Sequence, residues 1–208
     1  MTRPDVIKKV IELLQQLPGI GPRQAERFAY ALIDMKAEAP QSLGNALIEL
    51  AGGVTRCQDC MRVVQSGHTT CDTCTMGNVR HMIVIEKDQD IDAFERSGIV
   101  DTGFHLLRGF ILGGPDDALV RDRIRALYTR IEKVQKDSPN DPIEITLAFA
   151  STPDGDMTAA YISKILEPLA TPNLSITRLG RGLSTGAELE YADRDTIKNA
   201  YSSRNKTP

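Results

Sequence analysis

The chain has 208 residues, of which 41% are apolar and 25% charged, and its formal net charge is −3 at pH 7. This composition is typical of a globular protein of one or two domains and excludes an intrinsically disordered chain. No apolar run approaches the roughly 18 residues of a membrane-spanning helix, so we expect a soluble cytoplasmic protein. The acidic balance excludes a globally basic nucleic-acid binder and leaves room only for a local basic patch.

The first part of the chain predicts a helical hairpin. Residues 5–17 and residues 23–35 both carry apolar side chains at helical spacing. The sequence Leu-Pro-Gly-Ile-Gly-Pro at residues 17–22 separates them. A helix, an apolar-Pro-Gly-Ile-Gly turn and a second helix resemble the helix-hairpin-helix DNA-binding motif.

The chemistry of such a hairpin depends on its glycines. Gly19 and Gly21 let backbone N–H groups at the start of the second helix approach a phosphate, where the helix dipole also favours an anion. Arg23 and Arg27 lie four residues apart, so they share one helix face and add positive charge. The pattern predicts DNA binding that reads the backbone and not the sequence. The alternative is an ordinary helical hairpin used for packing or dimerisation.

A third helix is expected at residues 40–50, followed by a cysteine-rich ribbon. All of the cysteines stand in two C-x-x-C pairs separated by ten residues, a spacing typical of a tetrahedral zinc site: Cys57, Cys60, Cys71 and Cys74. His68 and His81 could replace a thiolate, but four cysteines already complete the ligand set. A closed all-cysteine set predicts structural Zn²⁺, whereas the alternative of two disulfides would suit a small secreted module.

The rest of the chain alternates strand and helix patterns. Strands are expected at residues 82–85, 105–112, 143–150 and 175–179. Between them, helices are expected from a cap at Asp88 or Asp90 through Ser97, at residues 115–136 and at residues 157–169, and a short last helix near residues 196–201. This alternation predicts an α/β fold with a doubly wound, mostly parallel sheet.

Three acidic residues fall where strands of this sheet end. Glu86 follows the first strand, and Asp154 and Asp156 lie in an acid-Gly-acid turn after the third. Ligands collect beyond the carboxyl ends of parallel strands, so these carboxylates could hold a hydrated Mg²⁺ weakly. A turn with a helix N-cap explains Asp154 and Asp156 equally well without a metal.

Taken together, the chain resembles the bacterial recombination mediator proteins of the RecR family over essentially its full length. The resemblance rests on five motifs in the family's order: the hairpin with Arg23 and Arg27, the four cysteines, Val84-Ile85-Glu86 with Asp90-Ile91, residues 152–159, and residues 186–191 with Asp193, Thr196 and Arg204. At residues 152–159 the family commonly carries glutamates.

The resemblance implies four parts: a helix-hairpin-helix DNA-binding region at 1–54, a four-cysteine zinc finger at 55–78, a Toprim domain at 79–178 and a C-terminal segment at 179–208. It also implies a non-enzymatic protein of recombinational DNA repair that binds single- and double-stranded DNA. Members form ring-like tetramers able to encircle DNA, and they act with RecO and RecF to load RecA onto single-stranded DNA at gaps. The three acids would then serve partner docking or weak Mg²⁺ binding.

Two rival functions fit the same motifs. One is a Mg²⁺-dependent Toprim nuclease or primase-like enzyme that uses the three acids for phosphoryl transfer, although no nucleophile or general base stands out. The other is an interaction module whose ribbon and hairpin only build an oligomer.

The chain also departs from the family in a shortened loop at residues 109–115, in Ser184 where proline is usual and in Ala187 where glycine is usual. Partner contacts and the choice between dimer and tetramer depend on such loops.

Overall fold

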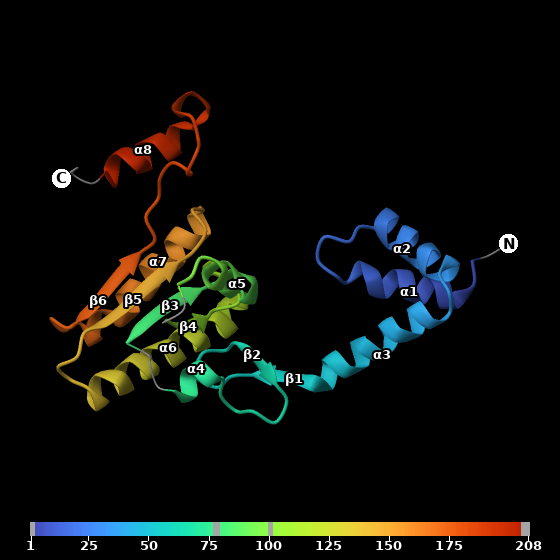
Figure 1. The fold of residues 1–208 in the computed structure, drawn as a ribbon, viewed down its shortest axis with the longest axis horizontal. Helices are drawn as coiled ribbons and strands as arrows, with labels where there is room; N and C mark the ends of the chain where they lie inside the picture. Colours follow the sequence, from blue (N-terminus) through green and yellow to red (C-terminus); the bar gives the residue numbers. More distant parts are fainter. Residues whose placement is uncertain (1–2, 77–79, 100–101, 205–208) are drawn as a thin grey trace. The chain divides into compact units, whose positions relative to one another are not determined.

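The computed structural model describes residues 3–76, 80–99 and 102–204 (Figure 1). The chain divides into two compact units, Met1–Val54 and Thr55–Pro208. The expected junction between zinc finger and Toprim domain, at residues 78 and 79, lies outside the described residues. Within the described ranges, none of the helices combines the length and apolar character that crossing a bilayer requires.

The first unit consists of three helices, α1 Asp5–Gln15, α2 Pro22–Asp34 and α3 Glu38–Gly53. Its small core forms between α1 and α2, where Ile11 packs against Ala25 and Ala29. Helix α2 begins at Pro22, because proline lacks only an N–H group that the first helical turn leaves unpaired. For the same reason α3 accommodates Pro40 in its first turn and begins earlier than expected. No residue of α3 is buried.

The second unit is built on a four-stranded parallel sheet, as the sequence predicted. Its strands are β3 His81–Ile85, β4 Gly103–Leu106, β5 Ile143–Ala148 and β6 Leu174–Arg178, in the order β4-β3-β5-β6. Val84 lies opposite His105 of β4 and Leu147 of β5. The chain changes direction across the sheet between β3 and β5, and ligands of such sheets commonly bind beyond the carboxyl ends of the strands at that point.

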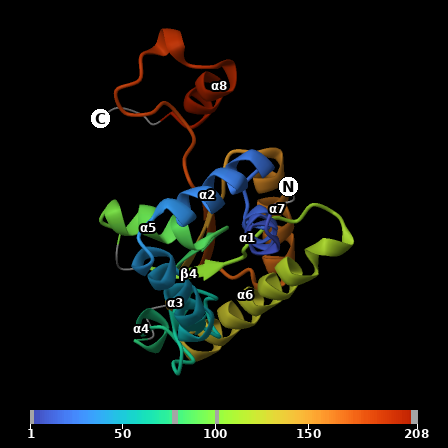
Figure 2. The same ribbon diagram turned by 90° about the vertical axis from the view of Figure 1, so that its right-hand side faces the viewer.

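Helices cover both faces of this sheet (Figure 2). Side chains alternate along a strand, so Met82 and Val84 pack with α6 Ala118–Asp137 and α7 Pro153–Leu166. Ile83 and Ile85 point the other way and pack with α5 Asp88–Arg96. The remaining elements are η1 Pro115–Asp117, η2 Glu167–Leu169, η3 Leu189–Tyr191 and α8 Arg194–Ser202.

Besides the start of α3, two expected boundaries were clearly wrong. The strand expected at residues 105–112 ends at Leu106, because Arg108 and Gly109 have φ angles of 56° and 150° that no strand accepts. The helix expected at residues 157–169 begins at Pro153, so the expected acid-Gly-acid turn is the first turn of α7. Thr152 caps this helix by accepting a hydrogen bond from the Gly155 N–H group at 3.2 Å.

The cysteine-rich ribbon comprises β1 Val54–Arg56, β2 Val63–Gln65 and the short helix α4 Asp72–Thr75, with β1 and β2 paired in a sheet of their own. It is fastened to α5. Arg56 donates to both carboxylate oxygens of Asp88 at 2.8 Å, and Arg62 pairs with Glu95 at 2.8 Å. Charged anchors and cysteines therefore hold the ribbon in place, and it contributes little apolar core.

Candidate metal centre and nucleic-acid interface

The hairpin between α1 and α2 places a helix N-terminus at the surface. Gly19 has a φ angle of 81°, which favours glycine, whereas Gly21 is extended at −81° and 169°, a conformation open to other residues. The backbone freedom expected of both glycines is therefore required only at Gly19. Within the described part of the chain, the N–H groups of Gly21 and Arg23 have no hydrogen-bond acceptor. Such N–H groups at a helix start suit an anion.

Two arginines stand on the helix that starts at this N-terminus. Arg23 and Arg27 are exposed, and neither pairs with an acidic side chain of the described residues. Glu26, the acid between them in sequence, is instead paired with Arg3. The geometry is compatible with the expected phosphate contact, and the role of Gly19, Gly21, Arg23 and Arg27 in DNA binding remains a prediction.

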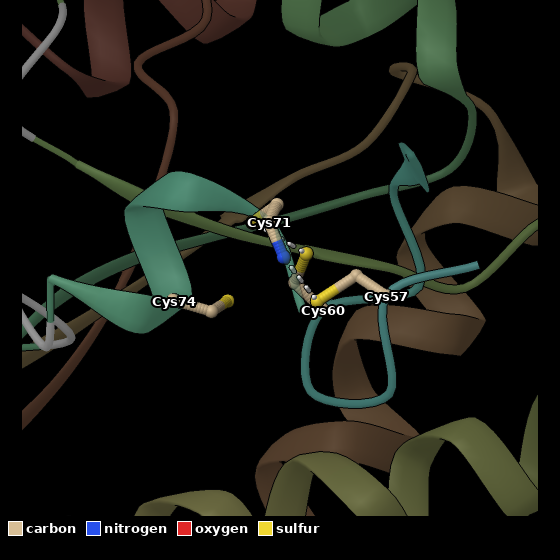
Figure 3. Close-up of side chains that lie close together, drawn as sticks. All are labelled: Cys57, Cys60, Cys71 and Cys74. Carbon is tan, nitrogen blue, oxygen red and sulfur yellow. Dashed lines mark hydrogen bonds between the residues drawn. The ribbon is translucent and has the colours of Figure 1, made fainter. Parts of the chain in front are cut away.

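The four cysteines come together as their spacing predicted (Figure 3). Their sulfur atoms all lie within 4.8 Å of one another, and Cys60 Sγ is 3.6 Å from Cys71 Sγ. Zn–S bonds of about 2.3 Å in a tetrahedron place sulfur atoms about 3.8 Å apart, so the cluster fits one ion. All four are free cysteines, which contradicts the disulfide alternative.

Backbone groups arrange the cysteines for metal binding. The Cys57 N–H donates to the Arg62 carbonyl at 2.8 Å, and the Cys71 N–H donates to Cys57 Sγ at 3.3 Å. Burial raises the pKa of the Cys57 thiol, but N–H groups of Cys60, Cys71 and Asp59 outweigh it and lower this pKa to about 7. The hydrogen bond with Cys74 and burial instead raise the pKa of the Cys60 thiol, and burial raises the pKa of the Cys71 thiol. A thiophilic cation such as Zn²⁺ would offset this cost and hold the four sulfur atoms as thiolates.

The three acids at the carboxyl ends of the strands do not assemble in this way. Among the described residues, only the cysteines form a group with metal-ligand geometry, so Glu86, Asp154 and Asp156 do not gather around one point. Asp154 is exposed and Glu86 half-buried. Asp156 instead forms ion pairs with Arg178 and Arg181, whose hydrogen bonds lower its pKa to about 2.

Sequence reasoning missed both arginines that hold Asp156, although one signal was present. Arg178 is the last residue of β6 and Arg181 follows it closely, so both lie at the carboxyl ends of the strands, where the three acids were also expected. It also missed Arg130 of α6, whose guanidinium donates to Cys74 Sγ at 3.3 Å. Nothing in the local sequence relates Arg130 to a cysteine that is far away along the chain.

Comparison with known proteins identifies the family. A family model described as "RecR, helix-hairpin-helix" matches residues 7–51. Proteins named "Recombination protein RecR" from Lactobacillus helveticus and Chlorobaculum tepidum are each 34% identical to this chain. The alignments cover 98% of both chains in the first case and 95% of both in the second. A protein of that name from Dehalococcoides mccartyi is also 34% identical, over 96% of this chain and 93% of its own length. The chain therefore belongs to the RecR family of recombination proteins.

Proposed function

We propose that this protein is a non-enzymatic DNA-binding mediator of recombinational DNA repair. The carrying observation is the near full-length similarity to proteins named "Recombination protein RecR", in a chain whose hairpin exposes two arginines that form no ion pair with a described residue. In this proposal Arg23, Arg27 and the N–H groups at the start of α2 contact phosphates of single- or double-stranded DNA. Such contacts bind without regard to sequence.

The protein acts as an oligomer in this proposal, a dimer or a ring-like tetramer that encircles DNA. An apolar groove in the first unit supports it. The groove has a volume of about 380 Å³ and is lined by apolar side chains of all three helices, among them Val6, Ile33, Leu43 and Leu47. These four side chains are 47–70% exposed in the single chain. A contiguous exposed apolar patch of this kind is typical of a surface that binds another protein. We propose that a second copy of the chain covers this groove.

Partner binding completes the proposal. The protein acts with RecO and RecF to load RecA onto single-stranded DNA at gaps, as the resemblance implies. Asp154 is exposed and Glu86 half-buried near the carboxyl ends of the strands, and their carboxylates suit docking to a basic partner surface. The four cysteines hold structural Zn²⁺, which has no open coordination position for catalysis.

The rival assignment, a Mg²⁺-dependent nuclease or primase-like enzyme, requires the three acids to share a cation. Asp156 is instead neutralised by Arg178 and Arg181, and a divalent ion there would meet two positive charges. We therefore propose no hydrolytic or synthetic activity for this edge of the sheet.

The test is DNA binding by a charge-reversal variant, Arg23→Glu with Arg27→Glu, at several salt concentrations. We expect weaker binding to every DNA sequence and a salt dependence reduced by about one released cation for each lost phosphate contact. The matched control, Lys9→Glu with Lys36→Glu, changes the net charge equally on exposed positions of the same unit, so its salt slope should stay near that of the unchanged protein.

Three outcomes would contradict the proposal. Equal loss of affinity in both variants would mean that only net charge matters. Absence of DNA binding at low salt by the zinc-loaded protein would favour the hypothesis of an interaction module that only builds an oligomer. Mg²⁺-dependent cleavage or extension of the DNA, abolished by Glu86→Ala, would restore the enzyme reading.

A further inference from the structure

The zinc centre is connected to the free edge of the main sheet. Strand β4 is an edge strand, so among the described residues no further strand pairs with the outer side of its backbone. The Leu106 N–H donates to the Cys60 carbonyl at 2.9 Å, so a metal-binding cysteine pairs with this edge. Exposed strand edges invite unwanted pairing and are often covered in this way.

A second connection runs through Arg130 of α6. One guanidinium nitrogen, Nη1, donates to the Phe104 carbonyl of β4 at 2.8 Å, and the other, Nη2, donates to Cys74 Sγ at 3.3 Å. Phe104 and Leu106 are two residues apart, so both hydrogen bonds lie on the same outer edge of β4. Arg130 therefore bridges the sheet edge and a predicted metal ligand.

The negative charge of a zinc-loaded centre explains why a positively charged guanidinium lies beside Cys74. Four thiolates around one Zn²⁺ carry a formal charge of about −2, which a mostly buried site must offset. Cys57, Cys60 and Cys71 are buried and Cys74 is half-buried. Arg130 is the one Lys or Arg side chain of the described residues that hydrogen-bonds to a cysteine sulfur.

We propose that Arg130 is an outer-sphere positioning residue of the metal centre. It fixes the direction of the Cys74 sulfur, offsets thiolate charge, and ties the metal centre to the β4 edge through the Phe104 carbonyl. Partners of metal ligands typically change metal affinity by 10–100-fold when they are removed. This inference does not depend on the proposed function.

The test measures Zn²⁺ transfer from the loaded, full-length protein to a chromogenic chelator. Arg130→Gln should release Zn²⁺ about 10-fold faster, and Arg130→Lys, which keeps the charge but not both hydrogen bonds, should lie between. Arg125→Gln is the control, since Arg125 stands exposed on the same helix and pairs only with Asp122 among the described residues. Its release rate should match that of the unchanged protein.

Amide hydrogen exchange of the same zinc-loaded variants supplies the second readout. Arg130→Gln should raise exchange at Leu106 and leave Ile145, in the central strand β5, protected. Faster exchange at Leu106 with unchanged Zn²⁺ release would mean that Arg130 only supports the strand, and the proposal would fail. It would fail equally if Arg125→Gln and Arg130→Gln released Zn²⁺ at the same rate.

Discussion

At the scale of single residues, two buried titratable groups, one in β4 and one in η1 after it, are held in opposite charge states. The Asp117 carboxylate accepts hydrogen bonds from the N–H groups of Leu112 and Gly113 at 2.8–3.1 Å, and these bonds, that from Leu112 foremost, lower its pKa. His105 is fully buried, and its Nε2–H donates to the Arg123 carbonyl at 2.9 Å. Asp117 therefore stays charged and orders the loop that replaces the expected strand end, whereas His105 stays neutral.

His105 predicts a pH dependence of stability. Burial, followed by the positive charge of Arg130, lowers its pKa from 6.5 to about 4. Between pH 6.5 and pH 4 this imidazole is therefore protonated in the unfolded chain but neutral in the folded protein. The free energy of unfolding falls as the pH drops through this range. Because one pKa unit corresponds to about 1.4 kcal/mol, we expect this residue to account for a loss of about 2 kcal/mol between pH 7 and pH 5.

The measurement compares the unchanged protein with His105→Gln, which keeps a donor for the Arg123 carbonyl but cannot titrate. Urea unfolding at pH 7 and pH 5, both with excess Zn²⁺, should show a smaller loss of stability for the variant. Protonation of the cysteines affects both proteins alike and cancels in the difference. Equal losses in the two proteins would assign the acid sensitivity to other groups.

At the scale of elements, the start of α7 depends on one glycine. A Cβ atom at Gly155 would lie 2.3 Å from the Ala150 carbonyl oxygen and 3.3 Å from Phe149 Cβ. Neither the backbone of Ala150 nor the first turn of α7 can move without disturbing the end of β5. The end of β5 and the start of α7 pass so closely that position 155 has no room for a Cβ atom. Its backbone angles alone would allow other residues.

We expect Gly155→Ala to destabilise the protein by about 3 kcal/mol, at the upper end for an overpacked site. Gly180→Ala is the control in the same unit, because a Cβ there meets no atom within 4 Å and the residue has an ordinary φ angle. Its stability should change by less than about 0.5 kcal/mol. Chemical denaturation of both variants measures the difference, and similar stabilities would show that the strand-to-helix turn can relax.

The accuracy of the sequence predictions follows the range of the interactions concerned. The cysteine cluster was predicted correctly, because C-x-x-C spacing is local and nearly determines the metal geometry. The β3 strand was recognised because both of its faces are buried, which leaves a continuous apolar run. After Leu106 the same signal was misleading, since Leu107 and Ile111 are buried in a loop and not in a strand. The ion pairs of Asp156 were missed, because Arg178 and Arg181 reach it from another element, and only their position at and after the end of β6 hinted at them.

At the scale of the whole molecule, an acidic chain has to concentrate its positive charge to bind DNA. The net charge of −3 repels a polyanion, and one hairpin offers two arginines at the start of α2. Repeating the hairpin in an oligomer multiplies these contacts, since later contacts form at high effective concentration once the first is made. The proposed DNA affinity and the proposed oligomer are therefore linked, and the apolar groove of the first unit is where they can be separated.

Leu47→Glu tests this link. Leu47 is 57% exposed and lines the groove, so a carboxylate there can remain hydrated in one chain but is buried and unpaired if a second copy covers it. We expect the unit to stay folded, the mass measured by sedimentation to fall by half, and DNA affinity to drop at least 10-fold although both arginines are intact. Gln41→Glu adds the same charge at an exposed position of α3 outside the groove lining and should change neither mass nor affinity. An unchanged mass for Leu47→Glu would exclude the groove as the contact between copies, and a reduced mass with full DNA affinity would show that DNA binding does not depend on this contact.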